Sequence, residues 1–195
     1  MTAVNVLRLP DSVSIITDTL AVMPNGHWFH TSKCTPIPHL KLAVATRGVV
    51  AALPMMVREI CANAHGFDTA RDFLDRHFRG MPLAEFDKAE RLAWQHGVEV
   101  FVAGWSSQGP AAFMISTVNT DWRVIDIPYA VCTPTVPPAE FEAFSADPIR
   151  NMPALLSAQA RADSSVGGSM IVTTISEHEI LTYSAGFIHQ GNAHG

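Results

Sequence analysis

Apolar and polar residues alternate near the start of the chain in the pattern typical of β-strands. Thr2–Leu9 (TAVNVLRL) shows this alternation, and Ser12–Thr17 (SVSIIT) repeats it after a short turn. We therefore predict a β-hairpin from these two segments. A short strand is expected at His27–Ser32 and a longer one at Leu40–Thr46 (LKLAVAT).

The middle of the chain changes to a helical period. Val49–Ala64 has apolar residues at helical spacing, and Pro54 is expected either to lie in the first turn of this helix or to kink it. Two further helices are predicted at Thr69–Phe78 and Leu83–His96. This part of the chain therefore contributes helices rather than strands.

Strand patterns return in the second half. Val98–Trp105 and Ala111–Thr117 flank a Ser-Ser-Gln-Gly-Pro turn and are predicted to form a second hairpin. Trp122–Ile127 is expected to extend the same sheet. A proline-rich loop is predicted at Cys132–Pro138, followed by a helix at Ile149–Ser164.

The chain is predicted to end with two strands, Ser169–Ile175 and Glu179–Phe187, and a flexible tail at residues 188–195. The order is therefore strands, helices, strands, helix, strands. Antiparallel hairpins combined with segregated helices are typical of an α+β fold. We expect one domain, residues 1–195, in which helices cover two packed antiparallel sheets.

Composition and charge exclude several classes of partner. Of the 195 residues 48% are hydrophobic and 16% are charged, as in a globular domain with a sizeable core. The net charge is −5 and no basic stripe is present, which argues against binding to nucleic acid or to anionic membranes. No apolar segment approaches the length of a membrane span.

The cysteines and the first residues favour a cytoplasmic protein. The chain has three widely spaced cysteines, Cys34, Cys61 and Cys132. An odd, scattered set is typical of reduced thiols. Arg8 and Pro10 interrupt the first apolar run, so no signal peptide is expected. In the cytoplasm, methionine aminopeptidase would remove Met1, because the side chain of Thr2 is small.

A threonine at a free N-terminus can be both nucleophile and base. Its hydroxyl is a weak nucleophile, but a free α-amino group titrates near pH 8 and can accept the hydroxyl proton. A nearby lysine ammonium, anchored by a buried carboxylate, tunes the electrostatics of such a site. Backbone N–H groups at a glycine turn can stabilise the oxyanion. This chemistry requires neither a metal nor an organic cofactor.

The sequence contains these groups in a plausible order. Thr2 would be the nucleophile and base, Asp18 the anchoring acid, Lys33 the ammonium and Gly48 the oxyanion turn. Each residue also has a simpler interpretation. Asp18 could cap a turn, Lys33 could be a solvated loop lysine, and Gly48 could be a structural glycine before a helix.

The same residues resemble a known family. The run from Thr2 through "ITDT", "SK" and "LAVATRG" is similar to the opening of a proteasome β-type subunit, a member of the Ntn-hydrolase superfamily. "VFVAGWSSQGPAAFMIS" and "ARADSSVGGSMIVTTIS" resemble later segments of that family. In the second of these, Asp163 matches the acid that supports the threonine. The resemblance implies a four-layer αββα sandwich with two antiparallel sheets.

The resemblance also implies a function. It suggests hydrolysis of peptide or small amide bonds by the Thr2 hydroxyl through an acyl-enzyme intermediate, with Met1 removed. It further implies a homo-oligomer, and it leaves open whether an ATPase partner exists.

The sequence departs from the family pattern in three places. Lys33 falls one residue earlier than the family's lysine, so Cys34 is the alternative occupant of that position. Val166 replaces a serine beside the threonine amine, with Ser164 and Ser165 only nearby. "CTPTVPPAEFEAF" replaces a small Ser-Gly segment. These departures keep open an alternative, in which the chain is a catalytically inactive binding or assembly subunit with the same fold.

Two other chemistries are less well supported. His27, His30 and Cys34 could suggest zinc, but a fourth ligand and the usual paired cysteines are absent from the pattern. Cys34 beside His30 or His39 could be a thiol nucleophile, but this would require an electropositive pocket. We expect neither site.

Overall fold

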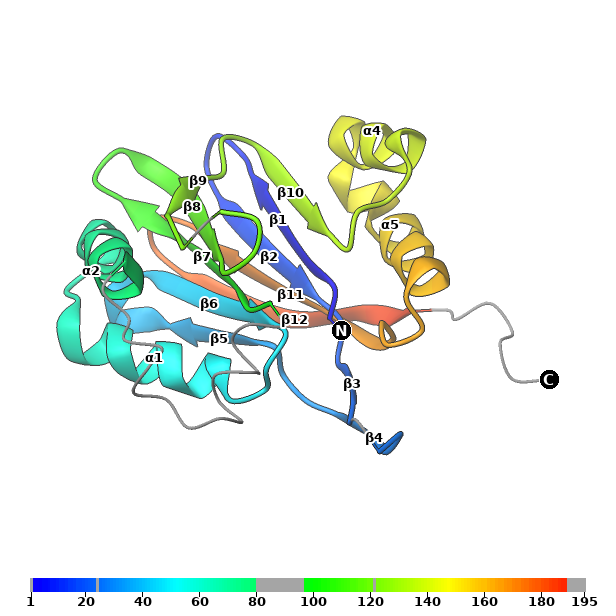
Figure 1. Cartoon of the computed structure of the whole chain (residues 1–195). Helices are drawn as coiled ribbons and strands as arrows, with labels where there is room; N and C mark the ends of the chain where they lie inside the picture. Colours follow the sequence, from blue (N-terminus) through cyan, green and yellow to red (C-terminus); the bar gives the residue numbers. More distant parts are fainter. Residues whose placement is uncertain (1, 24, 80–96, 121, 189–195) are drawn as a thin grey trace.

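Two five-stranded antiparallel sheets form the centre of the protein (Figure 1). The structure is a computed structural model that describes residues 2–23, 25–79, 97–120 and 122–188. The strand order of the first sheet is β10-β1-β2-β11-β12. Its strands are β1 (Val4–Arg8), β2 (Val13–Thr17), β10 (Ala130–Thr133), β11 (Gly168–Ile175) and β12 (Ile180–Ile188).

The second sheet has the order β5-β6-β7-β8-β9. Its strands are β5 (Cys34–Ile37), β6 (Leu42–Arg47), β7 (Glu99–Ser106), β8 (Gly109–Ser116) and β9 (Ile125–Asp126). A 3-10 turn at Pro38–Leu40 joins β5 to β6. A separate ribbon of β3 (Leu20–Val22) and β4 (Trp28–His30) projects beyond the end of β2 (Figure 1).

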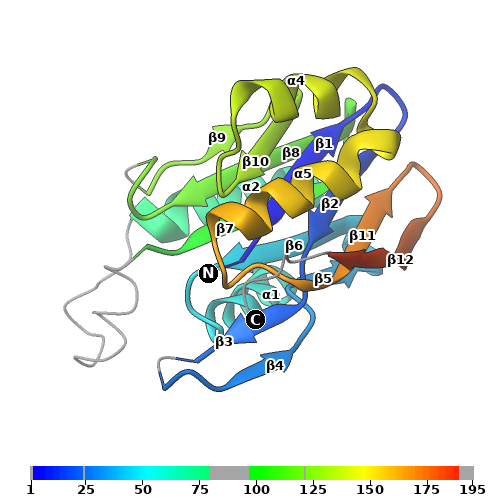
Figure 2. The same ribbon diagram turned by 90° about the vertical axis from the view of Figure 1, so that its right-hand side faces the viewer.

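Helices cover both outer faces of the sheets (Figures 1 and 2). Helices α1 (Ala52–Asn63) and α2 (Phe67–Arg79) lie against the second sheet. Helices α4 (Pro138–Ala146) and α5 (Pro148–Ala162) lie against the first. None of the described helices is both long and apolar enough to cross a membrane.

The core divides into three groups of buried side chains. One lies between α1, α2 and the second sheet, another lies between α4, α5 and the first sheet, and the third lies between the two sheets. The two-residue period of the strands sorts neighbouring residues among these groups. Ile15 faces the other sheet while Ile16 faces the helices, and Val44 faces the helices while Ala43 and Ala45 face the other sheet.

The α+β class and the main hairpins are confirmed. Strands β1 and β2 pair as predicted, as do β7 with β8 and β11 with β12. Strand β9 extends the second sheet, and Pro54 lies in the first turn of α1. The predicted helix Leu83–His96 lies outside the described residues. Of the expected tail, only Ile188 is described, and it ends β12 with 8% of its surface exposed.

Other predictions were incomplete because prolines obscured the pattern. Strand β5, which contains Pro36, was not predicted. An edge strand tolerates a proline because one side of the strand makes no ladder hydrogen bonds. The predicted loop Cys132–Pro138 is wrong at both ends: Cys132 and Thr133 belong to β10, and Pro138 begins α4. A proline in the first turn suits a helix, since its missing N–H needs no partner there.

Candidate active site

Thr2 lies two residues before the first residue of β1, a strand that pairs with β2 on one side and β10 on the other. This placement holds the start of the described chain inside the first sheet, and Thr2 is only 8% exposed. Thr2 lines a small cavity of about 50 Å³ together with Lys33 and Gly48. Three of the five predicted site residues therefore border the same space.

Asp18 and Lys33 form a buried ion pair. Asp18 follows β2 and is fully buried, and Lys33 precedes β5 with 6% of its surface exposed. The Lys33 Nζ lies 2.8 Å from Oδ1 and 2.9 Å from Oδ2 of Asp18. It also donates to the carbonyl oxygen of Leu20 in β3. Lys33, rather than Cys34, is thus the residue that contacts Asp18.

The Asp18 carboxylate is also tied to the backbone near Thr2. The N–H of Ala3 donates to Oδ1 at 2.9 Å, and the N–H of Gly167 donates to Oδ2 at 3.0 Å. The carboxylate therefore joins the beginning of β1 to the turn before β11. It also fixes Lys33 relative to Thr2, because Ala3 directly follows Thr2.

Burial shifts both members of this pair toward neutrality. Burial lowers the pKa of Lys33, although the attraction of Asp18 and, less strongly, of Asp163 opposes the shift. Burial likewise raises the pKa of Asp18, opposed by Lys33 and the two backbone N–H groups. Lys33 consequently gives up a proton more readily than an exposed lysine does. Such behaviour is common at catalytic sites, although structural ion pairs show it as well.

Gly48 occupies a position that only glycine fits. It lies between β6 and α1 with φ of +108°, in the region that side chains disfavour. A Cβ at this position would also collide with the carbonyl oxygen of Gly97. The tight turn brings the backbone at Gly48 to the cavity that Thr2 and Lys33 line.

We expect Gly48→Ala to lower the free energy of unfolding by roughly 1–3 kcal/mol, because it combines backbone strain with the Gly97 collision. Urea unfolding would measure this effect. Two glycines serve as controls: Gly26 has φ of +83° but would leave an added Cβ with no neighbouring atom within 4 Å, and Gly66 has open space without a positive φ. Equal stability of Gly48→Ala and Gly66→Ala would contradict the expectation.

Asp163 caps the C-terminus of α5. Its Oδ1 accepts hydrogen bonds from the Ser165 N–H at 3.0 Å and the Ser165 Oγ at 2.5 Å. Its Oδ2 is buried and has no hydrogen-bond partner among the described residues. Burial opposes ionisation, but the Ser165 hydrogen bonds and nearby positive charge, part of it from Arg47, outweigh it and hold the pKa of Asp163 below its ordinary value. A buried, ionised oxygen of this kind is suited to a further N–H donor.

Asp163 is thus near the Lys33 pair without touching it. In the described part of the chain, no hydrogen bond joins Asp163 to Thr2, Asp18 or Lys33, but its charge influences Lys33. Val166, which stands where the resemblance expects a serine, is fully buried. The nearest hydroxyl of this turn that contacts Asp163 is Ser165 Oγ, one residue earlier.

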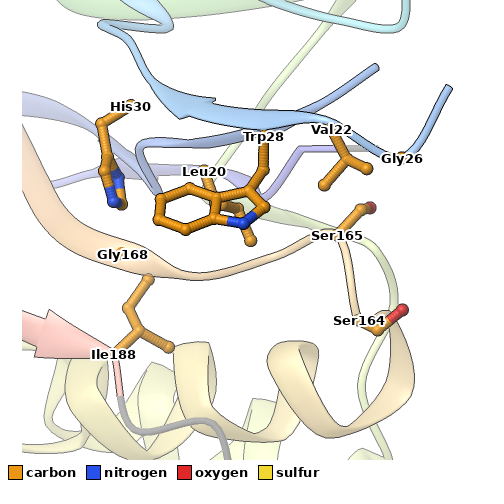
Figure 3. A pocket seen from close by; sticks show the side chains of 9 residues that line it. All are labelled: Leu20, Val22, Gly26, Trp28, His30, Ser164, Ser165, Gly168 and Ile188. Carbon is orange, nitrogen blue, oxygen red and sulfur yellow. The ribbon is translucent and has the colours of Figure 1, made fainter. Parts of the chain in front are cut away.

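A larger cavity of about 570 Å³ lies on the other side of β3 (Figure 3). It is bordered by the β3–β4 ribbon and by the turn that contains Ser164 and Ser165. The indole of Trp28 lies across it (Figure 3), and Trp28 is 66% exposed. Among the described residues, no aspartate, glutamate, lysine or arginine lines this space, so it suits an uncharged, largely apolar group. The sequence patterns did not reveal this cavity.

The two other chemistries considered gain no support. Burial raises the pKa of the Cys34 thiol to about 12, the opposite of what a thiolate nucleophile needs. His30 uses Nδ1 in a hydrogen bond of 3.0 Å with Thr19 Oγ1. Within the described ranges, no group of three His, Cys, Asp or Glu side chains is placed to hold a metal ion.

Comparison with known proteins supports a relationship at the level of the fold. No protein-family model matches the sequence, and no curated protein matches it. Among solved structures, the chain is similar to a Gly-1 mutant of Anbu from Hyphomicrobium sp. strain MC1, with a TM-score of 0.68 and 11% sequence identity. The match covers 95% of this chain and 87% of that one. The protein therefore shares its fold with Anbu at low sequence identity.

Proposed function

We propose that this chain is a proteasome-like Ntn-hydrolase that cleaves peptide or small amide bonds, with Thr2 as its nucleophile once Met1 is removed. The observation that carries the proposal is the buried Asp18–Lys33 pair, which is hydrogen-bonded to the peptide N–H that follows Thr2. The shared fold with Anbu, a proteasome-like Ntn-hydrolase, supports the superfamily. The three core groups support one four-layer αββα domain.

In this mechanism the free amine of Thr2 accepts the proton of its own Oγ, which attacks the substrate carbonyl. The Gly48 N–H stabilises the resulting oxyanion. The amine returns the proton to the leaving nitrogen, the C–N bond breaks, and an ester remains on Oγ. Water then hydrolyses this ester and regenerates Thr2. Lys33, held by Asp18, stabilises the developing negative charge, and the Asp163 Oδ2 accepts a hydrogen bond from the amine.

The cavities suggest a preference among substrates. The space beside Thr2, Lys33 and Gly48 has a volume of about 50 Å³, which suits a small side chain next to the cleaved bond. The larger uncharged cavity beyond β3 can hold an apolar group of the same substrate. We therefore expect short peptide amides with alanine at the cleavage position to be hydrolysed faster than those with phenylalanine.

Two measurements test the activity. The intact mass of the protein purified from its own cytoplasm shows whether Met1 is absent, as the mechanism requires. Fluorogenic peptide amides with alanine or phenylalanine at the cleavage position then report hydrolysis, and a peptide boronate should inhibit it. Retained Met1 would contradict the mechanism, because the Thr2 nitrogen would be an amide. Absence of hydrolysis by protein that lacks Met1 would also contradict it.

A second candidate function is a catalytically inactive binding or assembly subunit with the same fold. Val166 favours it, since this buried valine stands where the resemblance expects a serine next to the threonine amine. In either function we propose that the protein is a homo-oligomer and that it is located in the cytoplasm. Light scattering can measure the mass of the assembly and so test the oligomeric state. An electrophilic β-lactone separates the two functions: the enzyme is labelled and the inactive subunit is not.

A further inference from the structure

Arg47 reaches from the second sheet to the backbone of Thr2. It is the last residue of β6, directly before Gly48. Its Nε donates a hydrogen bond of 3.1 Å to the carbonyl oxygen of Thr2. Because β1 belongs to the first sheet and β6 to the second, this contact bridges the two sheets at the candidate active site.

Glu99 holds Arg47 in place. The two residues are paired directly across β6 and β7, so their side chains share one face of the sheet. The Arg47 Nη1 lies 2.8 Å from the Glu99 Oε2, and the side chains are 18% and 8% exposed, respectively. Asn119 Nδ2 donates to the Glu99 Oε1 at 3.0 Å, and Thr133 Oγ1 donates to Oε2 at 3.4 Å. The planar guanidinium is therefore held by partners on two sides.

Both polar groups of the peptide unit between Thr2 and Ala3 form hydrogen bonds with side chains. Its carbonyl oxygen accepts from Arg47, and its N–H donates to Asp18. A peptide group is planar, so fixing both ends of its dipole also fixes the position of the Thr2 Cα. The positions of the Thr2 amine and Oγ then depend mainly on rotations about the bonds to the Thr2 Cα.

We propose that Arg47, braced by Glu99, is a positioning residue for the Thr2 nucleophile. This inference rests on the proposed function. Arg47 acts through the Thr2 backbone, and its task is to hold Oγ and the amine in line with the substrate carbonyl. Displacements of about 1 Å at reacting groups can cost on the order of 100-fold in rate. Loss of Arg47 should therefore slow the chemical step more than it weakens binding.

The test measures covalent labelling of protein that lacks Met1 by a β-lactone, in which Oγ attacks the lactone carbonyl and the ring opens to an ester. The variants are Arg47→Met, Arg47→Lys and Glu99→Gln, and circular dichroism monitors their folding. Arg71→Met is the matched control, because Arg71 forms an ion pair with Asp126 at 2.8 Å on a more exposed part of the surface. The maximal labelling rate and the half-saturating lactone concentration are determined separately.

For Arg47→Met we expect the maximal rate to fall roughly 10- to 100-fold while the half-saturating concentration changes by less than about threefold. Arg47→Lys should recover only part of the rate, since an ammonium lacks the fixed fork that spans Thr2 and Glu99. Glu99→Gln should reduce the rate less than Arg47→Met, and Arg71→Met should match the wild type.

Two outcomes would overturn the inference in different ways. If the wild type is labelled but Arg47→Met and Arg47→Lys label at the wild-type maximal rate, Arg47 has no positioning role while the proposed function stands. If wild-type protein that lacks Met1 is not labelled, the proposed function and this inference both fail. Should Arg47→Met not fold, the maximal rates of Arg47→Lys and Glu99→Gln decide, and unchanged rates in both overturn the inference.

Discussion

Thr2→Ala is expected to abolish amide hydrolysis and β-lactone labelling, with a fall in kcat of roughly four orders of magnitude or more. The variant lacks the Oγ that attacks the substrate carbonyl in the first step, and loss of such a nucleophile typically has effects of this size. Hydrolysis of a fluorogenic peptide amide measures the change. Alanine and threonine are both small, so removal of Met1 should proceed equally in the two proteins.

Thr2→Ser is the matched control for this prediction. It keeps a hydroxyl and a small side chain at the same position, so substantial labelling should remain. Unfolding midpoints of the variants and the wild type should be similar, since a short side chain at the edge of a cavity contributes little packing. Undiminished hydrolysis by Thr2→Ala would show that another group performs the reaction.

Lys33→Met is expected to lower the free energy of unfolding by about 3–5 kcal/mol, because it leaves the buried Asp18 carboxylate without its countercharge. The same variant should lose most of its hydrolytic activity. Urea unfolding monitored by tryptophan fluorescence gives the stability, and the peptide assay gives the activity under conditions in which the variant is folded.

A surface pair and a double variant provide the controls for Lys33→Met. Arg58 pairs with Glu59 at 2.8 Å, but the arginine side chain is 74% exposed, so Arg58→Met should change stability by less than about 1 kcal/mol. Combining Lys33→Met with Asp18→Asn removes the buried charge and should restore part of the stability, without restoring activity. If Lys33→Met lowered the free energy of unfolding no more than Arg58→Met does, the Asp18–Lys33 pair would not be a buried, strongly coupled ion pair.

The sequence predicted the parts of the fold that depend on local pattern. Hairpins such as β1–β2 and β7–β8 have strand alternation on both sides of a recognisable turn. The ribbon of β3 and β4 was only partly foreseen, since β3 has three residues and the pattern predicted a strand near β4 alone. Helix α4 was missed because the prolines before it were interpreted as a loop.

For the candidate site, the sequence predicted which residues lie close together, but it did not predict all the contacts that hold them in position. The approach of Asp18 and Lys33 to the start of β1 was expected, and the structure places them there. The contact between Arg47 and Thr2 joins residues on different sheets, so no local pattern could indicate it. The only signal in the sequence was an arginine directly before the turn glycine. An arginine at an exposed strand end would look the same.

The larger cavity and the Ser165–Asp163 hydrogen bonds illustrate the same limit. The cavity exists because the ribbon of β3 and β4 stands beside the turn before β11, two segments that are remote in sequence. Ser165 contacts Asp163 because the chain turns at the end of α5, whereas alignment by glycine pairs pointed to Val166. Three-dimensional packing, rather than spacing, decides which hydroxyl reaches the carboxylate.

The most direct test of the central claim is to locate the adduct after protein purified from its own cytoplasm reacts with a β-lactone. Tandem mass spectrometry of the N-terminal peptide should show a chain that begins at Thr2 and carries one acyl group on the threonine oxygen. The account predicts this modification in the wild type and its absence in Thr2→Ala. An N-terminal peptide that still carries Met1, or an adduct confined to another residue, would contradict the account.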